Sequence, residues 1–291
     1  MTVLLTGATG FIGRHLLRLL SAEHDVVALA RGEPPKALSD HGTWVRQDLA
    51  SPLDPAKLPA QVQTVVHLAQ SERYRAFPEG AGDVVAVNVD AVAALADYAR
   101  IAGARRFVLC STGGVYGFRD GYAREQDPVA PAGFYPASKY AAEVLLAPYR
   151  DLFEPVVLRP FFVYGAGQRG MLVAGLAQRV LGGERVTIDG DPGLCCNPTH
   201  VRDAARAIAA AVSVQRLPGV VNVAGDEAVT LTQIVTGLAA AAGVQPLIAH
   251  AGEGSPGDLL GDNARMREAL GVTPQVALHE GLREVVCELR S

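Results

Sequence analysis

The feature that most constrains this chain is a glycine-rich turn within its first thirteen residues. A short apolar run leads into Thr6-Gly7-Ala8-Thr9-Gly10-Phe11-Ile12-Gly13, and a helical pattern of leucines follows. Glycines three residues apart permit a tight turn between a buried strand and a helix, because a Cβ atom would block the turn or a ligand's approach. The start of such a helix presents free N–H groups and a partial positive charge, so the segment predicts a phosphate or pyrophosphate site.

The first half of the chain alternates apolar runs with helical patterns. Helices are predicted near residues 11–22, 84–102 and 137–150, and candidate strands are Val3–Leu5, Val26–Ala30, Trp44–Arg46, Val65–Leu68, Phe107–Cys110 and Val156–Leu158. Continuous apolar strands alternating with helices predict a parallel sheet covered on both faces, and right-handed crossovers make it doubly wound. Ligands bind such sheets at the carboxyl ends of the strands.

The second half has a looser pattern of shorter elements. Helices are predicted near 171–181, 201–213, 230–242, 263–270 and 278–290, and short strands at Val186–Ile188 and Val220–Val223. The predicted fold is therefore α/β, with a Rossmann-type dinucleotide-binding domain over residues 1–160. Residues 161–291 are expected to form mainly a smaller substrate-binding lobe, with some elements returning to the Rossmann sheet.

Composition restricts the possible partners and location. The chain has 291 residues, of which 49% are hydrophobic and 19% charged, and its net charge is −4. This charge offers no basic field for nucleic acid or for a membrane surface. The apolar stretches are too short to span a bilayer and no signal peptide is recognisable, so we expect a soluble cytoplasmic protein. The four cysteines lack the paired spacing of a zinc site, and no metal is expected.

A tyrosine and a lysine four residues apart form a second candidate for chemistry. In Tyr135-Pro136-Ala137-Ser138-Lys139 the two side chains would share one face of a helix. A free phenol has a pKa near 10 and is a poor base at neutral pH, but a nearby ammonium stabilises the phenolate and lowers that pKa. The pair is therefore a candidate general acid/base, although the same spacing also arises by chance.

A third candidate lies where a predicted strand ends in hydroxyl groups and glycines. The segment reads Leu109-Cys110-Ser111-Thr112-Gly113-Gly114-Val115-Tyr116-Gly117. A hydroxyl at the carboxyl end of a strand can donate to a substrate oxygen as charge develops there. It can equally cap a turn.

Taken together and in this order, the three segments resemble the extended short-chain dehydrogenase/reductase family, the NAD(P)-dependent epimerase/dehydratase group. The resemblance covers nearly the whole chain. Further matching segments are Asp48-Leu49, Val66-His67-Leu68-Ala69, Asn88-Val89-Asp90, Leu158-Arg159-Pro160, Val163-Tyr164-Gly165 and His200-Val201-Arg202-Asp203.

The resemblance implies roles for particular residues. Thr112, Tyr135 and Lys139 would be catalytic, with Tyr135 as the general acid/base and Lys139 holding the nicotinamide ribose and depressing the tyrosine pKa. Asp48 would bond the adenine amino group. The residues expected to bind the cofactor are Gly7, Gly10, Phe11, Ile12, Gly13, Asp48, Leu49, Leu68, Ala69, Tyr135 and Lys139. Those expected to face the substrate are Asn88, Thr112, Phe162 and Cys196.

The end of the second predicted strand bears on the choice between NAD and NADP. NAD-dependent relatives usually carry an acidic residue there, to bond the ribose 2′-hydroxyl. Here the strand ends in Ala30 and is followed by Arg31, which could pair with a 2′-phosphate, and Arg14 could help. We therefore expect Arg31 to bind the cofactor and NADP to be preferred over NAD.

The chain departs from the family at two kinds of position. Dehydratases of the family carry Asp-Glu directly after the catalytic threonine, and this chain has Gly113-Gly114, so dehydration is not expected. Polar or cationic groups that contact the diphosphate of a nucleotide sugar are replaced by Phe162, Cys196 and Ser255. A buried diphosphate without such partners would be costly. Either another arginine substitutes (Arg73, Arg169 and Arg202 are candidates) or the substrate is not an ordinary nucleotide sugar.

Three functions follow from these observations. The first is an NADP-dependent oxidoreductase that acts on a carbonyl or alcohol carbon of a small polyfunctional substrate, such as a modified sugar or secondary metabolite. The second is a nucleotide-sugar 4-epimerase or 4-ketoreductase, which uses the same three catalytic residues. The third is a non-catalytic NADP-sensing regulator, which the retained tyrosine–lysine pair disfavours. A homodimer through the helices near 84–102 and 137–150 is also expected.

Overall fold

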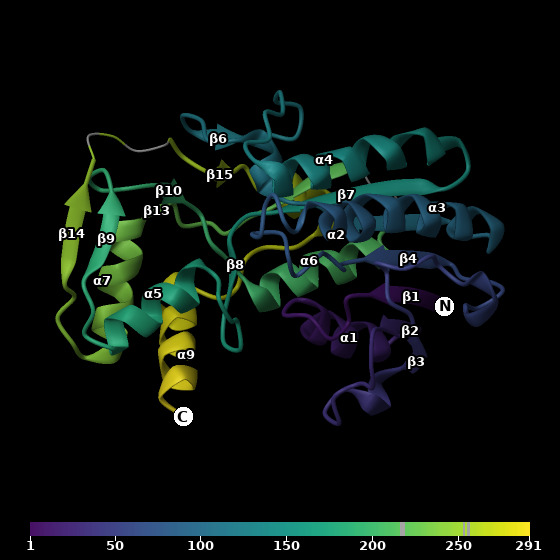
Figure 1. The fold of residues 1–291 in the computed structure, drawn as a ribbon, viewed down its shortest axis with the longest axis horizontal. Helices are drawn as coiled ribbons and strands as arrows, with labels where there is room; N and C mark the ends of the chain where they lie inside the picture. Colours follow the sequence, from purple (N-terminus) through teal and green to yellow (C-terminus); the bar gives the residue numbers. More distant parts are fainter. Residues whose placement is uncertain (216–218, 253, 255–256) are drawn as a thin grey trace.

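A seven-stranded parallel sheet forms the centre of the larger half of the computed structural model, which describes residues 1–215, 219–252, 254 and 257–291. The sheet has the order β12-β7-β5-β4-β1-β2-β3, and Figure 1 shows its strands one below another from β7 to β3. Its strands are β1 (Thr2–Thr6), β2 (Asp25–Ala30), β3 (Thr43–Arg46), β4 (Thr64–His67), β5 (Arg106–Cys110), β7 (Glu154–Pro160) and β12 (Val220–Val223). The predicted doubly wound sheet is confirmed, and its order reverses direction between β1 and β4, where such sheets bind ligands.

Two apolar layers bury the two faces of this sheet. On one face, leucines of α1 (Gly13–Ser21) and alanines of α6 (Val201–Ser213) pack with residues of α8 (Ala264–Leu270). On the other face, α3 (Ala91–Ile101) and α4 (Phe134–Leu146) pack against strand residues such as Phe107. Because each strand is covered twice, its sequence is apolar without alternation.

The helix predicted over residues 84–102 is interrupted. The structure has α2 (Ala81–Val85), a π-helical turn over Ala86–Asp90 and then α3. Asn88 lies in this wide turn with its side chain fully buried. π-helical turns occur frequently at functional sites, and periodicity does not reveal them.

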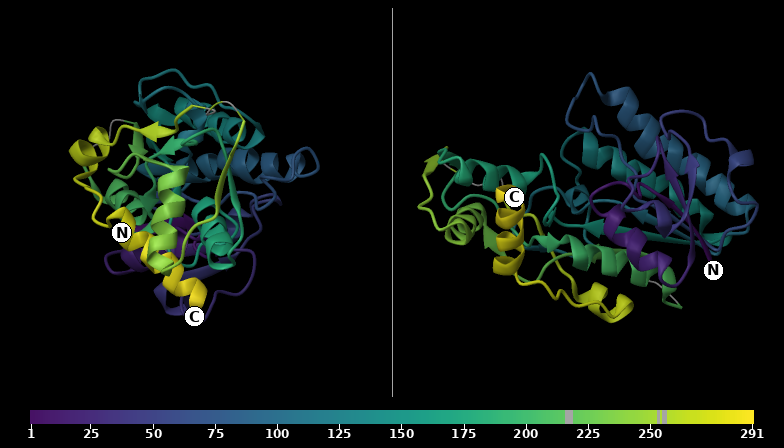
Figure 2. Two further views of the ribbon diagram at one scale, coloured as in Figure 1. Left: turned by 90° about the vertical axis from the view of Figure 1, so that its left-hand side faces the viewer. Right: turned by 90° about the horizontal axis from the view of Figure 1, so that it is seen from below.

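The second half forms a smaller lobe around its own apolar core (Figure 1, left side). The lobe contains α5 (Leu172–Leu181), α7 (Leu231–Ala242) and α9 (Leu278–Arg290), and β9 (Val186–Asp189) pairs in parallel with β14 (Ile248–Ala251). The right-hand view in Figure 2 shows the lobe beside the larger half.

Three pairs of two-residue strands were not predicted, and the first of them joins the two halves of the chain. They are β6 (Tyr122–Ala123) with β15 (Leu260–Gly261), β8 (Val163–Tyr164) with β11 (Thr199–His200), and β10 (Cys195–Cys196) with β13 (Val229–Thr230). Two residues are too few to show a period, so the sequence carries no signal for them.

The last strand of the main sheet comes from the second half of the chain. Val220 to Val223 of β12 pair with Val157 to Pro160 of β7. Residues 161–291 therefore contribute both a strand and the α6 helix to the larger half, and the division at residue 160 stays a prediction. Of the helices in the described residues, none combines the length and apolar character that a bilayer span requires.

Candidate active site

The glycine turn is as tight as the sequence predicts. Gly7 has φ +71°, and a Cβ built on it would lie 2.7 Å from the backbone nitrogen of Ala69. A Cβ on Gly13 would lie 2.0 Å from the carbonyl oxygen of Gly7. Neither position can carry a side chain without moving backbone, because real Cβ contacts do not approach so closely.

The helix start beyond this turn has free hydrogen-bond donors. Gly10 N donates to Gly7 O at 2.9 Å and Arg14 N donates to Gly10 O at 3.1 Å. Within the described residues, no acceptor is found for the backbone N–H groups of Phe11, Ile12 and Gly13, and no side chain caps α1. A Cβ on Gly10 would meet only Gly7 O, at 3.1 Å, so the space beside it is open. These residues fit the pyrophosphate of a dinucleotide.

The residues expected around the adenosine lie at the carboxyl ends of neighbouring strands. Asp48 and Leu49 follow β3, and Leu68 and Ala69 follow β4. Asp48 is exposed and accepts a hydrogen bond from Ala50 N at 3.0 Å, while Leu49 and Leu68 are half-buried. Together they offer a carboxylate and apolar surface at one edge of the sheet.

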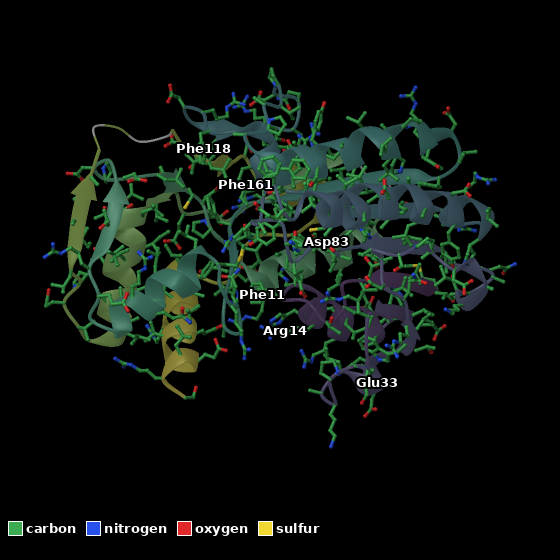
Figure 3. The ribbon with its side chains drawn as sticks, viewed as in Figure 1. Phe11, Arg14, Glu33, Asp83, Phe118 and Phe161 are labelled. Atoms are coloured by element: carbon green, nitrogen blue, oxygen red, sulfur yellow. The ribbon has the colours of Figure 1, made fainter. Side chains whose placement is uncertain are left out.

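Arg31 directly follows β2, and in the structure its side chain pairs with a carboxylate. Its guanidinium forms an ion pair with Glu72, with 63% of the Arg31 side chain and 74% of the Glu72 side chain exposed. This hydrogen bond raises the pKa of Arg31. Arg14 does not join it: Arg14 lies over the Phe11 ring at 5.3 Å and donates to Ala166 O at 3.1 Å. Figure 3 shows Phe11 and Arg14 where α1 faces the lobe.

The structure brings Thr112 and Tyr135 together. Thr112 follows β5, and its Oγ1 accepts a hydrogen bond from Gly114 N at 3.1 Å. Tyr135 lies in the first turn of α4, near enough to Thr112 for the threonine to lower its pKa, and donates from its hydroxyl to Gln70 Oε1 at 2.8 Å. The Tyr135 ring lies 5.0 Å from the ring of Tyr74.

Electrostatics at the tyrosine differ from the expectation. Burial raises the pKa of Tyr135, Cys110 and Tyr74 add to the rise, and Thr112 opposes it. Lys139 is 2% exposed, and burial lowers its pKa while Cys110 and Glu143 raise it. The predicted depression of the Tyr135 pKa by Lys139 is therefore absent in this arrangement, where desolvation of the phenol dominates.

A buried ion pair joins α4, the helix that carries Tyr135 and Lys139, to strand β7. Glu143, one turn beyond Lys139, accepts from Arg159 of β7 at 2.5 Å, and both side chains are 6% exposed. Ser111 also donates to Glu143. The Arg159 guanidinium lies 4.8 Å above the ring of Tyr116.

Two residues expected to contact the substrate are instead buried in the protein. Asn88 is fully buried, where its Oδ1 accepts from Ser71 N and its Nδ2 donates to Ser138 Oγ, both at 3.0 Å. Cys196 is fully buried in the apolar core of the lobe, where burial raises the pKa of its thiol to about 12. Asn88 therefore orients its neighbours, and Cys196 packs, because neither side chain reaches the surface.

Phe162 and its neighbour Phe161 shape the far side of the site. Phe162 has φ +37°, a conformation that is uncommon for a bulky residue, and its half-buried side chain packs against the lobe core. The Phe161 ring is buried (Figure 3), and a Cβ on Gly113 would lie 2.6 Å from it. A carboxylate side chain at position 113 is therefore sterically excluded, which agrees with the absence of dehydratase residues.

Three arginines, Arg73, Arg169 and Arg202, are candidates to replace the phosphate-binding residues that this chain lacks, and their environments differ. Arg202 pairs with Glu284 at 2.5 Å, and Arg73 donates to Glu79 O at 3.1 Å. Arg169 is exposed in the loop after β8. Ser255 lies outside the described residues.

Gln70 and Tyr74, in the loop that follows β4, are site residues that the sequence did not indicate. Both contact Tyr135 from this loop. A single exposed glutamine and a loop tyrosine carry no spacing signal, so only the fold reveals that they meet the site.

Comparisons with known proteins agree with this geometry. A sequence model of the NAD dependent epimerase/dehydratase family matches residues 3–224. The chain is 34% identical over 308 residues to a UDP-glucose 4-epimerase of Mycolicibacterium smegmatis (98% of this chain, 97% of the relative). It is 30% identical over 310 residues to a dTDP-4-dehydro-6-deoxy-D-allose reductase of a Streptomyces species (97% and 94%). The crystal structure of a Thermus thermophilus UDP-glucose 4-epimerase in complex with NAD superimposes with a TM-score of 0.83 at 30% identity (100% and 99%).

Proposed function

Because the chain belongs to the NAD-dependent epimerase/dehydratase family, we propose that it catalyses nicotinamide-dependent reduction of a ketone, or oxidation of the alcohol, on a sugar-like substrate. The observation that supports this most directly is the placement of Thr112, after β5, near the hydroxyl of Tyr135, on the helix that also carries buried Lys139. The free N–H groups of the glycine turn lie at the same edge of the sheet.

In this proposal Tyr135 transfers the proton, Thr112 stabilises the substrate oxygen and Lys139 positions the cofactor. Bound in the site, the cofactor supplies or accepts a hydride. The Tyr135 hydroxyl gives its proton to the substrate oxygen during reduction and takes it back during oxidation. The Thr112 hydroxyl, whose oxygen is held by the hydrogen bond from Gly114 N, donates its proton to the substrate oxygen as negative charge develops there. Lys139 holds the nicotinamide ribose.

A change of Tyr135 to phenylalanine tests this assignment. We expect Tyr135→Phe to lower kcat by at least about a hundredfold, which is the ordinary contribution of a general acid, and to leave the cofactor Kd nearly unchanged. Turnover is followed by NADPH absorbance, and cofactor binding by fluorescence. Activity within a few-fold of the wild type would contradict the proposal.

A nucleotide-sugar 4-epimerase or 4-ketoreductase is the second candidate, because relatives with at least 30% identity carry those names. An epimerase returns the hydride and shows no net change in nicotinamide absorbance, whereas a reductase consumes the reduced cofactor. Incubation with a panel of nucleotide sugars and small ketones, followed by absorbance, distinguishes the two.

For the cofactor we propose a preference for NADP. Strand β2 ends without a carboxylate and Arg31 follows it. The Arg31–Glu72 pair is solvent-exposed, and such pairs contribute about 0–1 kcal/mol, so a 2′-phosphate could displace Glu72. Arg31 is thereby our candidate ligand of the 2′-phosphate.

We further propose a cytoplasmic homodimer formed through α3 and α4. Exposed Val144 and Leu145 give α4 an apolar outer surface, with 53% and 44% of each residue accessible. Analytical ultracentrifugation of the wild type and of a Val144→Glu variant tests the interface. A monomeric wild type would contradict it.

A further inference from the structure

The side chain that accepts the proton of the Tyr135 hydroxyl belongs to Gln70. Gln70 follows Ala69 at the carboxyl end of β4, and its Oε1 lies 2.8 Å from the phenolic oxygen. Gln70 is exposed to solvent, and its side chain makes a hydrogen bond with Tyr135. A glutamine side chain presents both an acceptor oxygen and a donor NH2 group.

A closed ring of hydrogen bonds fixes the positions of the two residues. The residue after Gln70, Ser71, donates from its backbone to Asn88 Oδ1 at 3.0 Å. Asn88 Nδ2 donates to Ser138 Oγ at 3.0 Å, and Ser138 Oγ donates to the backbone oxygen of Tyr135 at 2.7 Å. Because Asn88 and Ser138 are buried, the loop after β4 and the start of α4 are held at a constant separation.

Two hydrogen bonds hold the hydroxyl groups of the site. Gly114 N donates to Thr112 Oγ1, and the Tyr135 hydroxyl donates to Gln70 Oε1. A hydrogen bond that accepts the phenolic proton stabilises the neutral form of the tyrosine.

We infer that Gln70 is a positioning residue that stabilises the protonated form of Tyr135, the form that gives its proton to the substrate oxygen during reduction of a ketone. This inference rests on the proposed role of Tyr135 as general acid/base. In reduction, the Tyr135 O–H bond breaks as an O–H bond forms on the substrate oxygen, while the carbonyl carbon accepts the hydride of the reduced nicotinamide cofactor. The Gln70 carboxamide then rotates so that its NH2 group donates to the phenolate.

The other titratable groups around the phenol come from three elements. Tyr74 lies on the loop after β4, Cys110 ends β5, and Lys139 lies one turn further along α4. Burial and the first two groups raise the pKa of Tyr135, in the same direction as the Gln70 contact.

Removal of the Gln70 side chain tests the inference without a substrate. Because Gln70 is exposed, Gln70→Ala both removes the acceptor and admits water, and both changes lower the pKa of Tyr135. We expect that pKa to fall by about one unit, a tenfold rise in the ionised fraction at a fixed alkaline pH. The phenolate is measured by ultraviolet absorbance as the difference between each protein and its Tyr135→Phe derivative.

Gln61→Ala is the matched control, since Gln61 is also exposed and lies before the opposite, amino end of β4. An unchanged Tyr135 titration in Gln70→Ala, including no ionisation in either protein up to the pH at which they unfold, would overturn the inference. An equal change in Gln61→Ala would also overturn it.

Kinetics separates this inference from the proposed function. If Tyr135→Phe retains turnover, the proposed function fails whatever the titration shows. If Tyr135→Phe is inactive and the inference holds, Gln70→Ala lowers by about one unit the pH above which kcat for reduction falls, because the protonated form of Tyr135 is then lost at lower pH. The pH profile of Gln61→Ala stays that of the wild type. An unchanged pH profile in Gln70→Ala would contradict the inference alone.

Discussion

At the scale of single residues, the two adjacent glycines after Thr112, the proposed catalytic threonine, have different environments. The Cβ position of Gly113 lies 2.6 Å from the Phe161 ring, whereas that of Gly114 has its nearest neighbour at 3.4 Å. The ring of Phe161 is 1% exposed and has little room to move. Gly113 therefore permits Phe161 to pack, while a side chain fits at Gly114.

This difference gives a stability prediction with a built-in control. We expect Gly113→Ala to lower the free energy of unfolding by about 1–3 kcal/mol, the usual cost of overpacking a core, and Gly114→Ala to change it by less than about 1 kcal/mol. Urea denaturation of both variants measures the difference. Equal stabilities would show that the Phe161 ring relaxes freely.

The Arg31–Glu72 pair gives a prediction on cofactor choice. Arg31→Ala should shift the ratio of kcat/KM for NADPH to that for NADH toward NADH by about tenfold, equivalent to about 1.4 kcal/mol. Glu72→Gln should shift it in the opposite direction, because it removes a carboxylate that competes with the 2′-phosphate for Arg31. A ratio that both variants leave unaltered would exclude Arg31 as the phosphate ligand.

The sequence predicted the role of a residue where only one structural role suits its type, as for a glycine in a tight turn. It failed for residue types that serve equally well in the interior or at a ligand. Gly7 and Gly13 have no room for a Cβ, so the glycine pattern located their turn. Asn88 and Cys196 could face either a ligand or the interior, and the structure buries both. Whether a polar side chain meets substrate or its own backbone depends on the long-range packing of its element.

At the scale of secondary-structure elements, helix α4 depends on an ion pair that solvent does not reach. Glu143 is the sole carboxylate hydrogen-bonded to Arg159 among the described residues, and Glu143 lies one turn beyond Lys139. Loss of the carboxylate would leave the guanidinium buried without a counter-charge. Such a loss is much more costly than the loss of an exposed pair.

We therefore expect Glu143→Gln to lower the free energy of unfolding by about 3–5 kcal/mol. Asp97→Asn is the control, because Asp97 pairs with Arg100 on the surface at 2.7 Å and exposed pairs contribute about 0–1 kcal/mol. Thermal unfolding followed by circular dichroism measures both. A similar Tm for the two variants would show that Arg159 finds another partner.

The long helices and strands were predicted to within a few residues because each has a clear apolar pattern that begins and ends sharply in the sequence. The predicted helix 201–213 coincides with α6, where His200 caps the first turn. The π-helical turn was missed because its register change comes from the buried hydrogen bonds of Asn88. The two-residue strands were missed because their pairing partners are distant in sequence.

At the scale of the whole molecule, the two halves meet through the loop that joins β8 to α5. Arg14 donates to Ala166 O at 3.1 Å from α1, and Arg75 donates to Gly170 O from the loop after β4. The Tyr74 hydroxyl donates to the sulfur of Met171 at 2.9 Å. Since Tyr74 also contacts Tyr135, this loop connects the lobe to the candidate catalytic residue.

Removal of one of these contacts should affect substrate more than cofactor. We expect Arg75→Ala to raise the KM for substrate several-fold and to accelerate backbone hydrogen exchange over residues 166–171, with little change in the cofactor Kd. Arg73→Ala is the control, because Arg73 donates within its own loop, to Glu79 O. An identical exchange rate in wild type and Arg75→Ala would show that Arg75 does not restrain the loop.

The position of β12 in the main sheet has a consequence for biosynthesis. A ribosome that has synthesised residues 1–160 has delivered the entire glycine turn, Thr112, Tyr135 and Lys139, yet β7 still lacks its second neighbour, because β12 spans Val220–Val223. The α6 helix, which with α1 covers one face of the sheet, is also still missing. The nascent nucleotide-binding half therefore has an open sheet edge and a partly uncovered apolar face until residue 223 emerges, which are the features that make incomplete chains prone to aggregate.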